Sequence, residues 1–480
     1  MLAKFAEDAD ELHEQGVQFV FGGTPPVAER ARKLSGFFTQ IFDGSQSPEE
    51  ILAFLRGEVL SDASQVTYPQ ETIARIAWKS PYPLLRHHFG LPTLQATEQG
   101  IAQIAEARVL DVLSLGIDQD AQENFFHPER QDPRAKGAGG VPVRSAEDYQ
   151  ALYMASRRGN YPLMRTYTGT DDFIRLAEMY TKTIHNAWCA VPLFWFNQMD
   201  GRGPLSLEDS IHEHQTVMAW YGARGIPVEL NEPHHWGMRD ASDVIFVVSA
   251  YLSAWNARAF GVQDYIAQMM FNSPPGTSDA MDLAKMQAIL ELIQPLESNS
   301  FHIWRQTRTG LLSYPLEHND ARAHLAASVY LQMMLRPHIL HVVGHTEADH
   351  AATAQDVIDA CLMSRQAIED ALRGQPDFRS DAHILARVEH LKSEAQFTLQ
   401  AIARLAPTGT PDPLTDPATL GRAIRLGVLD APQLKNNPFA PGTLSTRILL
   451  GGSEAVNEQN QPISEQERLE KIFDKRSSHE

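Results

Sequence analysis

Four stretches of the sequence decide the fold: PVELNEPHHW from Pro227, DYIAQMMFNSPP from Asp264, FHIWRQTRTG from Phe301 and HILHVVGHTEAD from His338. Each is an apolar run that ends in polar residues, and each begins 37 residues after the one before it. One strand, one loop, one amphipathic helix and a return loop need roughly that many residues. Apolar strands that alternate with such helices are typical of a parallel sheet covered by helices.

Three similar runs precede these four: VLDVLSLGID from Val109, PLMRTYTG from Pro162 and AVPLFWFNQMDGRG from Ala190. Seven βα units predict an α/β protein with a (β/α)8 barrel of the TIM type. An open doubly wound sheet is the alternative, because alternation alone does not exclude it. We expect the eighth strand either at 423–429 or at 17–21.

The pattern divides the chain into three parts. Residues 1–107 have apolar positions at helical spacing and are predicted to form a helical N-terminal extension. Residues 108–375 are predicted to form the catalytic barrel. Residues 376–480 contain a Pro-rich stretch and a charged tail, and we expect a helical and irregular C-terminal extension that caps the barrel.

The composition excludes several classes of function. With 41 Lys and Arg against 60 Asp and Glu, the formal charge is −19, which repels phosphate backbones and anionic lipid. No stretch of about 18 uncharged apolar residues occurs, and the first residues lack the apolar core of a signal peptide. Two cysteines are too few for a disulfide framework. We expect a cytoplasmic protein that binds neither nucleic acid nor membrane, with a homodimer left open.

Polar residues end every predicted strand, where a parallel barrel has its active site. The residues that we predict to bind substrate are Arg165, Tyr167, Asn197, Asn231, His235, Gln268, Asn272, Arg305 and Arg308. Arg165, Arg305 and Arg308 predict a clamp for carboxylates, because a guanidinium presents a planar fork of donors. The alternative is that these arginines pair with Glu229, Glu232 or Asp200.

The sequence lacks the motifs of several common chemistries. There is no G-x-S-x-G elbow, no phosphate-binding loop, no GxGxxG after a strand and no HExxH. None of the lysines ends a predicted barrel strand, so a Schiff base is not expected. We predict no metal site and expect neutral histidines to contact a ligand. A barrel mouth without a nucleophile suggests that a cofactor carries the difficult chemistry.

The segment AIRLGVLDAPQLKNNPFAPG, residues 423–442, resembles the C-terminal substrate-site region of the large subunit of glutamate mutase, an adenosylcobalamin-dependent enzyme. The order of helical N-terminus, barrel and long C-terminal extension is also similar to that family. The resemblance implies an isomerase that rearranges a carboxylic or amino acid by a radical mechanism. It also implies a separate cobalamin-binding subunit over the mouth, because the nearest string to Asp-x-His-x-x-Gly is 381–386, which lacks the Gly.

The resemblance further implies a Glu that accepts a hydrogen bond from the substrate amine, for which Glu229 and Glu232 are the candidates. We predict His341 as a third catalytic residue, and His345 and Asp430 as contacts of the cofactor. Two alternatives remain open. One is a barrel methyltransferase that acts with a corrinoid protein, and the other is a metal-dependent hydrolase or aldolase that uses His341, His345 and His350.

Overall fold

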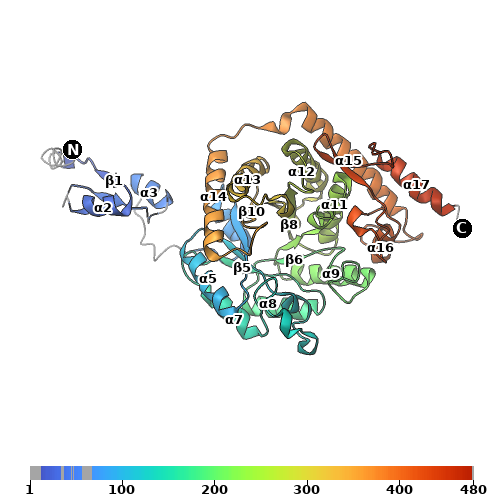
Figure 1. Ribbon diagram of the computed structural model, residues 1–480, viewed down its shortest axis with the longest axis horizontal. Coiled ribbons are helices and arrows are strands. Elements are labelled where there is room, and N and C mark those ends of the chain that lie inside the picture. The colour runs from blue at the N-terminus through green and yellow to red at the C-terminus, as the bar shows by residue number, and fades with distance from the viewer. Residues whose placement is uncertain are drawn as a thin grey trace. The chain divides into compact units, whose positions relative to one another are not determined.

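The computed structural model describes residues 12–13, 15–33, 37–44, 46, 48–56 and 67–477 (Figure 1). The chain divides into two compact units, residues 1–68 and residues 69–480. In the described part, no helix has the length and apolar character needed to cross a membrane.

The first unit contains a small parallel sheet, in which β1 (Val20–Gly22) pairs with β2 (Gln40–Phe42). Helix α2 (Pro25–Arg32) connects the two strands, and α3 (Pro48–Leu55) follows them. Two prolines begin α2, where their missing N–H groups cost no helical hydrogen bond. The prediction that 17–21 could form the eighth barrel strand is wrong, because Val20 and Phe21 pair with β2 instead.

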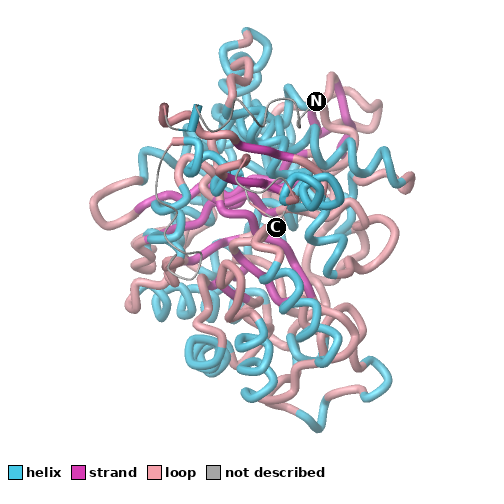
Figure 2. The backbone as a smooth tube through the Cα atoms, turned by 90° about the vertical axis from the view of Figure 1, so that its left-hand side faces the viewer, coloured by secondary structure: helices cyan, strands magenta, loops and turns pink. Residues whose placement is uncertain are grey.

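The second unit is a barrel of eight parallel strands with the helices outside them (Figures 1 and 2). The strands are β3 (Leu84–Phe89), β4 (Val112–Leu115), β5 (Leu163–Arg165), β6 (Cys189–Val191), β7 (Val228–Leu230), β8 (Asp264–Phe271), β9 (His302–Thr309) and β10 (Ile339–His341). Their order is β5-β4-β3-β10-β9-β8-β7-β6. The Ala187 amide donates to the Met164 carbonyl at 2.8 Å between the two edges. The predicted TIM-type barrel is confirmed.

The strand that sequence reasoning did not find is β3, the first of the barrel. It pairs with β10 on one side and β4 on the other. The barrel therefore begins before residue 108, and the boundary predicted there falls inside it. The other expected position, 423–429, is not a strand, because α16 (Pro417–Arg425) and the turn after it occupy that segment.

A layer of helices surrounds the strands: α4 (Thr72–Lys79), α5 (Leu94–Glu106), α7 (Ala146–Ala155), α8 (Phe173–Thr183), α9 (Leu207–Gly222), α11 (Asp243–Ala259), α12 (Asp279–Ile293), α13 (His318–Gln332) and α14 (Ala354–Leu372). Side chains cap many of them; Ser145 and Thr353 both form capping boxes with an Asp three residues later. Two short helices follow strand ends, α6 (Gln119–Glu123) after β4 and α10 (Glu232–Gly237) after β7.

The C-terminal extension consists of α15 (Ala382–Ala403), α16, a hairpin of β11 (Thr446–Leu449) and β12 (Gly452–Ala455), and α17 (Glu465–Ser477). Helix α15 packs against α11 and α12 (Figure 1). Single 3-10 turns complete the chain at 128–130, 133–135, 294–296, 311–313, 333–335, 378–380 and 432–434. The extension is thus anchored to one side of the helical layer.

Candidate active site

A layer of buried polar side chains crosses the interior of the barrel. Arg86 on β3 donates to Gln306 Oε1 at 2.9 Å and to Glu229 Oε2 at 3.2 Å. Its Nε donates to the hydroxyl of Ser114 on β4 at 2.7 Å. The Trp188 indole donates to the same Glu229 oxygen at 2.6 Å. Each strand contributes these residues because alternate side chains of a barrel strand face inwards.

Arg165, at the end of β5, is fully buried beside this layer but only partly paired. Its Nε donates to Ser114 Oγ at 3.1 Å, and its Nη2 lies 3.9 Å from Glu229 Oε2. Neither of its terminal nitrogens has a hydrogen-bond partner among the described residues. The guanidinium lies 5.2 Å from the Tyr167 ring and 5.7 Å from the Trp188 ring. Packing therefore holds a charged donor fork in place with its donors unused.

Cations outnumber anions in this interior. Arg308 on β9 is buried, and it has no ion pair among the described residues. Burial and then the charge of Arg165 lower the pKa of Arg86 to about 9, which leaves it protonated at neutral pH. Burial would raise the pKa of Glu229, but Arg86 and Arg165 outweigh burial and hold that pKa below its ordinary value. The interior is therefore net positive.

A cavity of about 310 Å³ opens above this layer, at the carboxyl ends of the strands. Its lining consists of His87, His88, Gln122, Tyr167, Phe196, Arg202, Asn231, His234, His235, Met238, Arg308, Leu311, His341, Val342, Val343, Gly344 and Glu347. Burial, and then neighbouring positive charge, hold the pKa of four of its histidines well below the ordinary value: His88, His234, His235 and His341. These rings are neutral at physiological pH.

The tautomer of His88 follows from its partners. Its Nε2 lies 3.1 Å from Nη2 of Arg86 and 3.3 Å from the Tyr167 hydroxyl. A guanidinium can only donate, so Nε2 of His88 accepts and the ring proton is on Nδ1. The His341 ring lies 5.0 Å from the His88 ring, which places two neutral imidazoles side by side above the guanidiniums.

The opposite wall carries polar atoms without partners. In the described part of the chain, both ring nitrogens of His235 and the Oδ1 of Asn231 make no hydrogen bond. His234 contacts Gln268, whose Nε2 lies 3.1 Å from its Nδ1. Buried polar groups are nearly always hydrogen-bonded in folded proteins. These atoms are therefore available to a ligand in the cavity.

Most of the predicted site residues gather at this place. Tyr167, Asn231, His235, Arg308 and His341 line the cavity, Arg165 and Glu229 lie in or beside the layer below it, and Gln268 contacts the lining residue His234.

Three predicted substrate contacts do not line the cavity. Arg305 donates to the Arg336 carbonyl at 2.9 and 3.2 Å, because it faces the opposite side of β9 from Gln306 and Arg308. Asn197 donates to the Phe194 carbonyl and the Ser210 hydroxyl, and so shapes the loop after β6. Asn272 accepts from the Ser328 hydroxyl at 2.8 Å, outside the cavity.

Glu232, predicted as catalytic, has both carboxylate oxygens occupied. One accepts from the backbone amides of Leu193 and Phe194 at 2.6 and 3.0 Å, and the other accepts from the Trp236 indole at 2.7 Å. Burial raises the pKa of Glu232 to about 7 despite these donors. The side chain therefore fixes the loop after β6, and both of its oxygens are engaged by the protein.

The two predicted cofactor contacts do not line the cavity. Asp430 accepts from four backbone amides, those of Ala431, Gly442, Thr443 and Leu444, and thereby closes a loop of the C-terminal extension. His345 has no hydrogen-bond partner in the described residues, but its ring packs edge-on against His318 at 5.2 Å. Both carboxylate oxygens of Asp430 thus serve the structure of this loop.

Sequence reasoning missed Arg86, His87 and His88. All three belong to LLRHHF, the unrecognised first strand. The 37-residue spacing does not find this strand, because 37 residues before Val109 is position 72, where α4 begins. Glu347, in the loop after β10, also lines the cavity without having been chosen.

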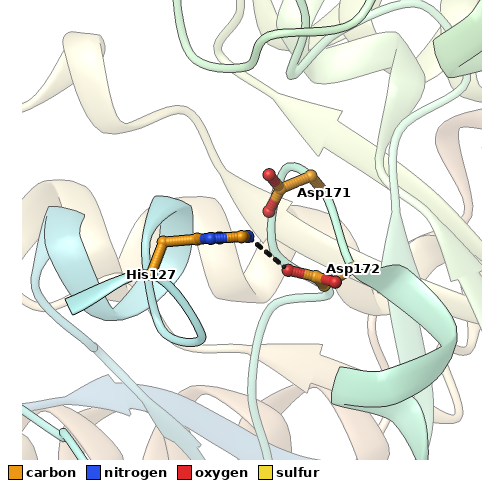
Figure 3. Close-up of side chains that lie close together, drawn as sticks. All are labelled: His127, Asp171 and Asp172. Atoms are coloured by element: carbon orange, nitrogen blue, oxygen red, sulfur yellow. Dashed lines mark hydrogen bonds and ion pairs between the residues drawn. The ribbon is translucent and has the colours of Figure 1, made fainter. Parts of the chain in front are cut away.

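Among the described residues, one group of side chains meets the distance requirement for a metal: His127, Asp171 and Asp172 (Figure 3). His127 Nε2 lies 2.9 Å from Asp172 Oδ2, all three side chains are partly exposed, and Arg130 lies 4.0 Å from Asp171. This arrangement is a surface ion-pair group. The set suggested for a metal-dependent enzyme, His341, His345 and His350, does not come together, because His350 is exposed and pairs with Asp349 and Asp356.

No protein-family model matches the chain, and no curated protein matches it in sequence. Among solved structures it is similar to the N-acetylneuraminic acid synthetase of Leptospira borgpetersenii, with 11% identity over 65% of this chain and 93% of that chain and a TM-score of 0.36. It is also similar to the phospho-2-dehydro-3-deoxyheptonate aldolase of Thermotoga maritima, with 12% identity over 61% of this chain and 71% of that chain and a TM-score of 0.37. A rubisco-like protein from Burkholderia fungorum is similar with 15% identity over 68% of this chain and 71% of that chain and a TM-score of 0.38. Similarities at this level carry no information about activity.

Proposed function

We propose that the chain is an enzyme whose barrel holds a small carboxylate substrate. The observation that carries the proposal is the unbalanced charge: Arg86, Arg165 and Arg308 are buried with one ionised carboxylate, Glu229, among them. A buried charge without a partner is costly, so a negatively charged ligand is the group that would complete the site. The cavity volume of about 310 Å³ suits a small acid.

The roles of the side chains follow from their contacts. Arg165 offers its unused terminal N–H groups to a carboxylate, while Ser114 and the Trp188 ring keep the guanidinium in position. Glu229 and Gln306 fix Arg86. Neutral His88 can only donate, from Nδ1, because its Nε2 already accepts from Arg86, whereas Nδ1 of neutral His341 has no partner among the described residues and can contact a bound acid. The barrel walls exclude water from the reacting atoms.

We further propose the finer assignment that the resemblance implies: the substrate-binding subunit of an adenosylcobalamin-dependent mutase. The cavity is too small for a corrin ring, so the cofactor would be held over the mouth by a separate subunit. When bound there, it would supply the radical that starts the rearrangement. Asp381, in the string nearest to a cobalamin-binding motif, is the N-cap of α15 and accepts from the amides of His383 and Ile384.

The first experiment tests the carboxylate site. Isothermal titration of the full chain with glutarate should show binding that Arg165→Met weakens by about 10- to 100-fold, the range of 1.5–3 kcal/mol for hydrogen bonds to a charged group. Arg305→Met is the matched control, because that arginine lies outside the cavity. Equal affinity in the wild type and Arg165→Met would contradict the proposal.

The second experiment tests the finer assignment. The chain is combined under anaerobic conditions with adenosylcobalamin and a carrier protein that contains Asp-x-His-x-x-Gly, and substrate is added. A cob(II)alamin signal in the electron paramagnetic resonance spectrum supports a mutase. Formation of methylcobalamin instead would identify the alternative, a methyltransferase that acts with a corrinoid protein. Stoichiometric zinc in the purified chain would favour the metal-dependent alternative.

A further inference from the structure

We infer that the ligand of this cavity is an acid that carries no ammonium group, so that amino acids are selected against. The inference rests on the proposed carboxylate site and narrows its substrate class. It depends on where the acidic side chains around the cavity are, on which of them have a free oxygen, and on the charge that surrounds the remaining polar groups.

A ligand ammonium needs an anionic or strongly polar acceptor, and the interior offers no free carboxylate for that purpose. Glu229 does not line the cavity; its Oε2 accepts from Arg86 at 3.2 Å and from the Trp188 indole at 2.6 Å, and its Oε1 lies 3.4 Å from the same Arg86 nitrogen. The oxygens of Glu232 are occupied by two backbone amides and an indole. Both acids near the base of the cavity are therefore committed to the protein itself.

Glu347 is the one carboxylate among the residues that line the cavity. It belongs to the exposed loop after β10, at the rim, and Arg308 is a charged neighbour with which it forms no ion pair. Burial raises the pKa of Glu347 and the charge of Arg308 acts against that rise, so the guanidinium offsets this carboxylate in part. An ammonium bound at the same point would compete with Arg308 for it.

The surroundings also act against a second cation. Arg202 also lines the cavity, where it pairs with Asp200 at 2.7 Å, and Arg239 stacks on Trp195 at 3.9 Å, close to His235. Burial and these charges favour the neutral form of His235. The arginines that disfavour a protonated His235 ring would repel a ligand ammonium placed beside that ring in the same way.

The unpartnered atoms fit a different group. Asn231 offers a carbonyl oxygen, and His235 in its neutral form offers one donor and one acceptor. A hydroxyl or a carbonyl on the ligand can satisfy them without bringing a charge. The substrate class is therefore a small carboxylic acid whose other polar group is a hydroxyl, a carbonyl or a second carboxylate.

Two acids that differ only in the amine test the inference: glutarate and L-glutamate, titrated separately into the full chain. We expect glutarate to bind at least about 10-fold more tightly, a difference of 1.4 kcal/mol. Tighter binding of L-glutamate would overturn the inference and leave the carboxylate site standing. If neither acid binds, the proposed carboxylate site and the inference both fail.

A variant sharpens the test by supplying the missing acceptor. Asn231→Asp places a carboxylate in the cavity wall, and we expect it to raise the affinity for L-glutamate relative to glutarate by about 10-fold. Asn231→Ser, which adds no charge, is the matched control. An unchanged ratio in a folded Asn231→Asp protein would count against the inference. Should that variant not fold, the ratio in the wild type still decides.

Discussion

Two clusters of buried charge differ in how completely their members are paired. The first cluster lies where the barrel helices α11 and α12 meet the C-terminal extension. Lys285 lies 2.8 Å from Asp282 and 3.1 Å from Asp243. Arg387 lies 2.8 Å from Asp243 and also pairs with Glu454. Each cation has a close carboxylate. In the barrel interior, Arg86 lies 3.2 Å from its carboxylate, Arg165 lies 3.9 Å from the same one, and Arg308 forms no ion pair among the described residues.

This difference in pairing distinguishes a structural cluster from a candidate binding site. The paired cluster joins α11, α12, α15 and β12, and it fastens the C-terminal extension to the barrel. It holds itself together, so it needs no ligand. The interior cluster has the same degree of burial but has one carboxylate, Glu229, for three arginines, and one of these, Arg308, lines the cavity. Burial of charge alone indicates little, whereas unbalanced burial indicates a binding site.

The largest expected effect comes from breaking the paired cluster. Lys285→Met leaves Asp243 and Asp282 with less compensation and removes the bond from Nζ to the Ser273 carbonyl. We expect the free energy of unfolding, measured by urea denaturation, to fall by about 3–5 kcal/mol. Lys392→Met is the control, because its surface pairs should contribute less than about 1 kcal/mol. Equal losses of unfolding free energy in the two variants would contradict the structural role of the paired cluster.

The fold could be predicted where strands are apolar and evenly spaced. The runs of β7, β8, β9 and β10 revealed the repeat, because each is an apolar run that ends in polar residues at a constant spacing. The first strand, LLRHHF, could not be recognised by the same criterion. Its polar residues Arg86, His87 and His88 are part of the site. The residues that build the cavity are the ones that hide the strand from a search for apolar runs.

The site could be predicted only as far as strand ends and alternation reach. Arg308 and Arg305 look equivalent in composition, yet alternation along β9 puts only the first in the cavity. Partners distant in the chain are not visible in a sequence. The carboxylate of Asp430 is filled by amides 12 to 14 residues later, and that of Glu232 by amides 38 and 39 residues earlier. Tertiary contacts thus decide which acids remain free.

Removing the one anion of the interior cluster should have the next largest effect. Glu229→Gln leaves Arg86 and Arg165 facing each other without counter-charge. We expect the free energy of unfolding to fall by about 3 kcal/mol. At saturating glutarate the difference in unfolding free energy from the ligand-bound wild type should shrink for Glu229→Gln, since the ligand supplies a carboxylate. It should stay unchanged for Lys285→Met, because glutarate stabilises that variant as much as the wild type. A smaller difference in both variants, or in neither, would erase the distinction between the clusters.

Acid should weaken the cavity region through His87. Burial lowers the pKa of this ring from its ordinary 6.5 to about 4. Between those values the unfolded chain binds a proton that the folded chain does not, so stability is full above pH 6.5 and is lost as the pH falls towards 4. His87 contributes up to about 1.4 kcal/mol per pH unit to the slope, and the other neutral histidines of the cavity add to it. His87→Gln should reduce the slope by that contribution, and the exposed His383→Gln should not; a wild-type slope in His87→Gln would contradict a contribution from His87.

The smallest effect on stability is expected at Arg165, the residue that we propose to bind the carboxylate of the ligand. Arg165→Met removes a charge whose terminal nitrogens have no hydrogen bond in the described structure, and Arg86 continues to donate to Ser114. An apolar side chain of similar length costs little there, so we expect urea denaturation without ligand to change by less than about 1 kcal/mol in either direction. The same variant should lose glutarate binding. A loss of stability as large as that of Lys285→Met would mean that Arg165 is paired for structure, and the interior cluster would then resemble the C-terminal one.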